Sequence, residues 1–168
     1  MTTALAASLA LSLVASFNQS SDVGSVNQDV KFTPNYVFTD GTGANQARIL
    51  FSDTRTLAAS ANENLDLAGV LTDVFGNVLT FDKIKAIIVT AAAANTNTVV
   101  FGGAASAQAA PWFGDVADTN VIRPGGLLAM VAPDANGFDV TATTADLLKI
   151  ANGGAGTPVT YTIVLIGV

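Results

Sequence analysis

Apolar residues occur in short runs along this chain, and residues that favour turns stand between the runs. Several runs alternate with period 2, and none carries the 3.6-residue period of an amphipathic helix. About nine or ten short strands at this spacing are typical of an antiparallel sandwich or barrel. We therefore predict an all-β fold, an antiparallel β-sandwich of jelly-roll type, as a single domain over residues 1–168.

Three segments carry the strongest strand patterns. Ile84–Ala94 is the most apolar, and we expect a strand that is buried on both faces. Val70–Phe81 has two apolar runs around a turn and predicts a hairpin. Val159–Ile166 alternates and predicts the last strand. In residues 26–39 the alternation is interrupted by Pro34, which predicts an edge strand or a bulged one, because proline cannot donate to a β-ladder.

Residues 1–20 predict an N-terminal strand or arm that docks on a neighbouring chain. From Leu5 to Phe17, Leu, Ala and Phe occupy the odd positions, and Ala and Ser occupy most even ones. We expect the Leu/Phe face to pack in a core and the Ala/Ser face to approach another sheet or subunit. A cleaved signal peptide is the alternative. It is disfavoured by the alternation and because the first basic residue is Lys31.

The chain contains no histidine and no cysteine. It therefore lacks the imidazole and thiolate groups on which most nucleophilic catalysis and transition-metal binding depend. None of its glycine pairs has the context of a phosphate-binding loop, because each lacks the following helix and lysine. We predict that the protein is not an enzyme and uses no cofactor and no metal.

Only 12% of the residues are charged although half are apolar, and the net charge is −6. A surface in contact with water normally carries about 25–35% charged residues, so we expect other subunits to cover much of this one. The protein is predicted to be a homo-oligomer, with a trimer favoured. The few basic residues form no stripe, which argues against nucleic acid as a partner. No apolar run is long enough to span a membrane.

We assign candidate interface residues at positions whose side chains could contact another subunit. Ala and Ser on the N-terminal strand allow another backbone to approach closely. An arginine before a Pro-Gly turn can pair with an acid of another subunit, and the single tryptophan is a candidate contact residue. The predicted subunit or capsid interface comprises Ser8, Ser12, Val14, Ser16, Arg123 and Trp112.

One segment has the spacing of oxygen ligands. Asp134, Asn136 and Asp139 stand as the first half of a calcium loop would, but the glutamate that completes such a loop is missing. An ordinary Asn-Gly turn between two strands is the favoured interpretation.

Several motifs resemble a recurring type of small protein that tailed bacteriophages encode among their structural genes. The resemblance covers most of the chain after about residue 35. It is carried by residues 39–47, 53–57, 65–67, 113–115, 123–126 and 146–152. Proteins of this type are virion components of the decoration or accessory class. The resemblance implies a structural role and names no activity.

These observations together predict a non-enzymatic virion structural protein of a bacteriophage. We expect a capsid decoration or cement protein that stabilises the head by binding neighbouring capsid subunits. It would be located in the virion, assembled in the cytoplasm of the bacterial host, with the major capsid protein or other virion proteins as partners. The alternatives are a head–tail connector or tail component, and a carbohydrate-binding module of a receptor-binding fibre.

Overall fold

The computed structural model describes residues 4–168 and is all-β, as predicted, with its strands in several antiparallel sheets. Residues 4–168 contain sixteen strands and no helix, so no helix among them could cross a membrane. The strands are β1 (Ala7–Ala10), β2 (Leu13–Ser21), β3 (Gly24–Phe32), β4 (Asn35–Asp40), β5 (Gln46–Ala47), β6 (Ile49–Leu57), β7 (Asn62–Asp66), β8 (Ala68–Thr72), β9 (Val78–Thr80), β10 (Lys83–Ala91), β11 (Val99–Gly102), β12 (Thr119–Ile122), β13 (Leu127–Val131), β14 (Phe138–Asp139), β15 (Leu147–Asn152) and β16 (Val159–Gly167).

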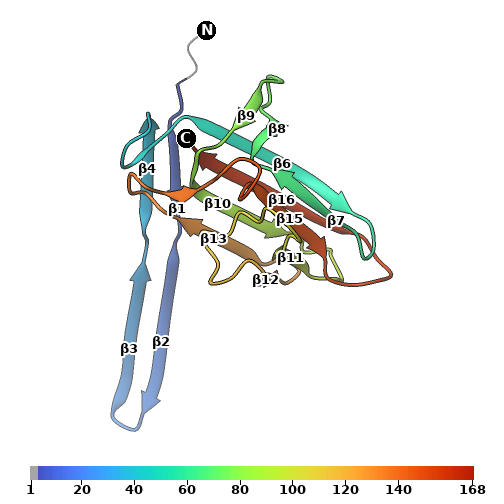
Figure 1. Cartoon of the computed structure of the whole chain (residues 1–168). Coiled ribbons are helices and arrows are strands. Elements are labelled where there is room, and N and C mark those ends of the chain that lie inside the picture. Colours follow the sequence, from blue (N-terminus) through green and yellow to red (C-terminus); the bar gives the residue numbers. More distant parts are fainter. Residues whose placement is uncertain (1–3) are drawn as a thin grey trace.

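Two sheets form the body of the molecule (Figure 1). The first has the strand order β13-β10-β16-β6, with the short β14 also paired to β10. The second has the order β12-β11-β15-β7. Every strand pair in these two sheets is antiparallel. The hairpin predicted over Val70–Phe81 is present as β8 and β9, on either side of a turn that Asp73 caps.

A single hydrophobic cluster joins the two sheets. Alternate residues of β16, such as Ile163 and Leu165, are fully buried, as the alternation predicted. They share this cluster with residues of the second sheet, including Leu148 and Phe101. Alternate burial on two sheets with one common core explains why the pattern of period 2 dominates the sequence.

Strand β10 is buried on both faces only in its first half. Four consecutive residues, Ile84 to Ile87, are buried, whereas Ile88 is partly exposed. The difference arises because strands β1 and β4 cover the outer face of the sheet at this end. Ala86 and Ile166 of the sheet lie there in a second hydrophobic cluster with Phe38.

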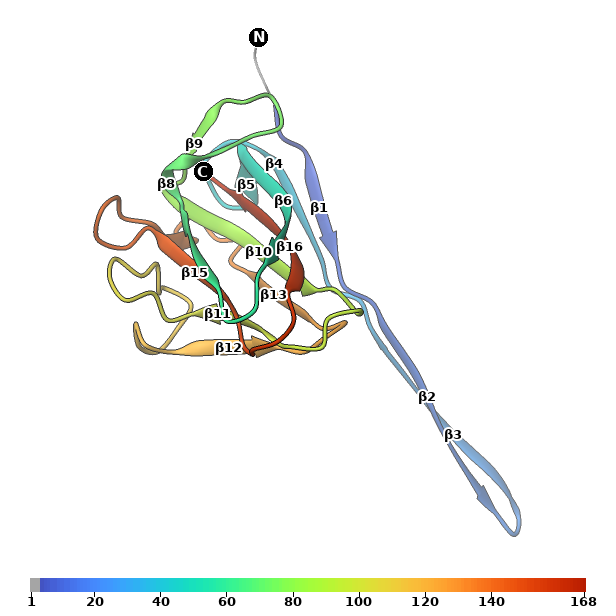
Figure 2. The same ribbon diagram turned by 90° about the vertical axis from the view of Figure 1, so that its right-hand side faces the viewer.

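The N-terminal segment departs from the prediction. Residues 1–3 of the predicted 1–20 segment lie outside the described residues. Strand β1 is half-buried on its odd face, but all of β2 and β3 is exposed. These two strands form a long hairpin that projects from the body (Figures 1 and 2). Leu11 and Phe17, which we expected in a core, are 51% and 72% exposed, so that expectation is wrong beyond Leu9.

Candidate docking arm

The projecting hairpin, residues 13–32, is called the arm below. Its two strands pair in perfect register from Leu13 opposite Phe32 to Ser21 opposite Gly24. Each strand has nine residues, which at about 3.3 Å per residue gives an arm roughly 30 Å long. The main contacts of β2 and β3 are with each other. A two-stranded hairpin alone is only marginally stable in water, so an arm of this length calls for a partner.

The arm is the outer part of one continuous antiparallel ribbon. Ala7 faces Phe38 at the body, and the same register continues to Leu13 opposite Phe32. The ladder is interrupted where Pro34 stands, because proline has no N–H group. A hydrogen bond of 3.1 Å from the Leu11 amide to the Pro34 carbonyl still joins the two halves. The register is the same on both sides of Pro34, so the strand is not bulged, and β4 lies between β1 and β5 rather than at a sheet edge. The prediction of an edge or bulged strand over residues 26–39 is therefore wrong for β4, and the ribbon stays extended across Pro34.

One face of the arm is apolar and the other is polar, because side chains alternate along each strand. The apolar face carries no charged residue and has only Gln19 and Gln28 as large polar side chains. The residues that give it its apolar character are Leu13, Ala15, Phe17, Val26, Val30 and Phe32. Their exposed side chains form a stripe of a kind that soluble monomers rarely leave in water.

Part of the polar face of the arm is hydrogen-bonded within the arm itself. The Ser16 hydroxyl donates a 2.7 Å hydrogen bond to the Asn27 side chain, whose amide donates in turn to Asp29. Val14 is paired with Lys31 on this face. The hydrogen bonds hold the polar face in place, so the apolar face is the side of the arm that needs a partner.

At the base of the arm the apolar face continues into a groove of about 280 Å³. Leu11 and Phe32 belong to the ribbon and also line this groove. The opposite wall belongs to the outer face of the first body sheet, where Ile88, Leu127 and Ala129 are not covered by the ribbon. The groove and the apolar face of the arm thus form one continuous apolar surface without a charged side chain.

The structure locates the predicted interface residues of the N-terminal segment on the opposite side. Ser8 is exposed on β1 and donates a hydrogen bond to Asn35. Ser12 lies at the junction between β1 and β2, and Val14 and Ser16 lie on the polar face of the arm. The register therefore exposes the Leu/Phe face, and not the Ala/Ser face, as the apolar surface that lacks a partner.

The remaining two predicted interface residues lie apart from the arm. Arg123 is exposed directly after β12. Trp112 is partly buried and packs on the main core, with its ring 6.2 Å from that of Phe101 and 5.6 Å from that of Phe138. Its indole N–H is buried without a hydrogen-bond partner.

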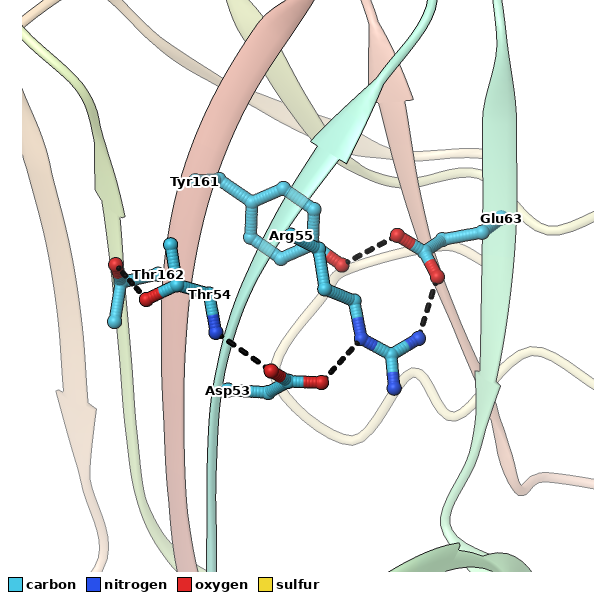
Figure 3. Close-up of polar contacts among 6 residues, drawn as sticks. All are labelled: Asp53, Thr54, Arg55, Glu63, Tyr161 and Thr162. Carbon is cyan, nitrogen blue, oxygen red and sulfur yellow. Dashed lines mark hydrogen bonds and ion pairs between the residues drawn. The ribbon is translucent and has the colours of Figure 1, made fainter.

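A partly buried polar cluster that the sequence analysis did not foresee joins the two body sheets (Figure 3). Arg55 of β6 binds Asp53 at 2.8 Å and reaches Glu63 of β7 at 2.5 Å. The hydroxyl of Tyr161 on β16 donates to the second oxygen of Glu63 at 2.8 Å. Because β6 and β7 are edge strands of different sheets, inward-pointing charges here connect the sheets and protect both edges from unwanted pairing.

Burial, followed by the hydrogen bond to Glu63, raises the pKa of Tyr161 far above the usual tyrosine value. In the unfolded chain a tyrosine ionises near pH 10. Neutral Tyr161 therefore contributes stability that is fully present below about pH 10 and is lost as the pH rises further. We expect urea midpoints to fall less steeply with pH above about 10 in Tyr161→Phe than in the native chain or in the control Tyr36→Phe. Equal slopes in all three proteins would contradict this.

The Asp134 segment forms a turn between β13 and β14, as favoured in the sequence analysis. The carboxylate of Asp134 accepts hydrogen bonds from the amides of Gly137 and Asn136, and these bonds hold its pKa below the usual range. The buried Lys85 ammonium donates to the Asp134 carbonyl oxygen. Within residues 4–168, no three acidic side chains are grouped in a way that could hold a metal ion.

No protein-family model, curated protein or solved structure matches this chain.

Proposed function

We propose that the two body sheets form a β-sandwich of jelly-roll type. The support is the pairing order of their eight main strands. In chain order the first pairs with the eighth, the second with the seventh, the third with the sixth and the fourth with the fifth. These pairs are β6 with β16, β7 with β15, β10 with β13, and β11 with β12. Such nesting is expected of one long antiparallel ribbon rolled into two sheets, and eight-stranded jelly rolls occur in viral capsid and lectin domains.

On this body we propose a non-enzymatic structural protein of a tailed-bacteriophage virion, working as a capsid decoration or cement protein. The observation that carries the proposal is the arm. It presents an uncharged apolar face, with Phe17 72% exposed, on an extended support that reaches away from its own body. A face of this kind suits permanent packing against a neighbouring chain in an assembly. The resemblance to phage structural proteins points in the same direction.

The outer face of the first body sheet also suits an assembled state. Beyond the groove it carries a ladder of threonines, in which Thr54 is hydrogen-bonded to Thr162 and Thr56 to Thr160. Hydroxyls paired across strands make a flat neutral surface that needs no counter-charge. We propose that an oligomer of the chain lies across neighbouring major capsid subunits or other virion proteins, with assembly in the host cytoplasm.

The test is binding to particles. Purified protein is mixed with tailed-phage particles assembled without it, the particles are sedimented, and bound protein is located by electron microscopy. We expect saturable binding with regular positions on the head. Density at the neck or along the tail would replace the decoration role with that of a connector or tail component. Protein that stays entirely in the supernatant would contradict a virion role.

The second candidate function is that of a carbohydrate-binding module, and one surface pocket favours it. A pocket of about 330 Å³ beside the Arg55 cluster is lined by polar side chains, among them Asn64, Asp66 and Asp73. Such groups can bind sugar hydroxyls, and lectins share the jelly-roll architecture. The pocket offers little aromatic surface on which a sugar ring could stack, because its one aromatic residue, Phe51, is buried. Binding on a glycan array that Asn64→Ala abolishes would support this second function.

A further inference from the structure

We propose that the arm of one copy packs its apolar face on the uncovered groove and sheet face of a second copy of this chain. The inference deepens the proposed function, on which it rests, by naming the chain that receives the arm. It starts from a contact that already exists within each copy. The inner part of the ribbon face, including Leu9 and Phe38, packs on the outer face of the first body sheet around Ala86 and Ile166.

The same ribbon face and the same sheet face both continue past this contact without a partner. The ribbon face runs out along the arm to Phe17 and Val26. The sheet face runs on through Ile88 to Leu127 and Ala129, which line the groove. The ribbon face and the sheet face pack on each other within one chain. Each of them therefore also has an apolar continuation that nothing within residues 4–168 covers.

The two extensions cannot meet within one copy. Phe17 lies six residues beyond Leu11 of the groove, which is about 20 Å along an extended strand. The continuous register, with the hydrogen bond from Leu11 to Pro34, keeps the ribbon straight instead of folding it back. A second copy supplies the missing partner, and a heterologous contact of this kind between copies closes into a ring where the rotation allows it.

Size and charge agree with a copy as occupant. Covering the large apolar side chains from Leu11 to Phe32 removes on the order of 700 Å² per chain from water, close to the roughly 800 Å² per partner of a standard interface. The chain has a net charge of −6, so copies repel one another on average. Neither the apolar face of the arm nor the groove carries a charge, so contact there brings no like charges together. Three such contacts in a ring would close the trimer that we expect.

The test uses the absence of cysteine from the chain. Single-cysteine variants Phe17→Cys and Ala129→Cys are refolded together without any phage particle and oxidised mildly. We expect a disulfide-linked dimer that contains one chain of each variant. The matched control pairs Ser16→Cys, on the polar face of the arm, with Ala129→Cys, and it should link at least tenfold more slowly. Equal linking in both mixtures would overturn the proposal, as would preferential linking of Phe17→Cys to itself.

A second measurement does not depend on disulfide geometry. In sedimentation velocity we expect the native chain to be an oligomer and Phe17→Asp to associate at least 100-fold more weakly, with an unchanged circular dichroism spectrum. The control Val14→Asp, on the polar face, should remain an oligomer. A native chain that is monomeric but still binds particles would overturn this inference and leave the virion role intact. Oligomers that do not bind particles would contradict the virion role alone.

Discussion

A chain without the arm is expected to keep a folded body and to lose binding to phage particles by about 100-fold or more. Without the arm we expect a monomer, which binds a particle at one site instead of several, and multivalent binding raises affinity by about 100-fold or more. The structure allows a clean excision. Ser12 and Thr33 face each other in the continuous register of the ribbon, so residues 13–32 can be replaced by an Asn-Gly turn, which suits a two-residue hairpin. Co-sedimentation measures binding, and circular dichroism measures the fold.

The matched control for this excision replaces the β8–β9 turn, the other exposed apolar tip of the molecule. Val74 and Phe75 are 84% and 77% exposed there, and changing both to Ser removes exposed apolar surface elsewhere on the molecule without touching the arm. This control should bind particles like the native chain. If the armless protein also binds normally, the arm is not the docking element. If it unfolds, the arm has a structural role that its full exposure does not predict.

Replacement of Phe101 with Ala is expected to destabilise the body by about 3–5 kcal/mol, the cost of truncating a large aromatic residue in a packed core. Phe101 is 0% exposed and contacts the rings of Trp112 and Phe113. For a chain of this length the melting temperature should fall by roughly 6–20 °C. Calorimetry or thermal circular dichroism measures the change.

The matched control is Phe75→Ala, which makes the same chemical change at an exposed position. It should alter stability by less than about 0.5 kcal/mol. A similar loss of stability in both variants would mean that Phe75 is covered in the protein in solution, as it would be in a further interface. A small effect at Phe101 would contradict the common core of the two sheets.

Much of the body could be predicted because burial on a two-sided sheet repeats every second residue. The closing strand β16 and the β8–β9 hairpin follow directly from such local patterns. The polar cluster could not be predicted. Arg55 and Glu63 are separated by the turn between two sheets, and Tyr161 comes from the far end of the chain. Nothing local to any of the three indicates that their side chains meet.

The arm could have been found from a further pattern. The alternation from Leu13 to Phe17 is mirrored by that from Val26 to Phe32, with turn-forming residues between them. The two patterns together indicate a hairpin in which both strands share one apolar face. We instead expected a single strand or arm over residues 1–20 with its Leu/Phe face in a core, because alternation shows which residues share a face and does not show what covers that face.

The amino-acid sequence by itself determined that this protein is made of short antiparallel strands and which side chains share each strand face, since the direction of side chains is a local property of an extended backbone. Only the tertiary structure decided which of those faces are covered. Leu9 and Leu13 stand on the same face of the same ribbon, yet Leu9 packs on the body and Leu13 is 53% exposed. Burial differs between them because the body sheet ends beneath the ribbon, and the position of that end depends on contacts with strands more than a hundred residues away.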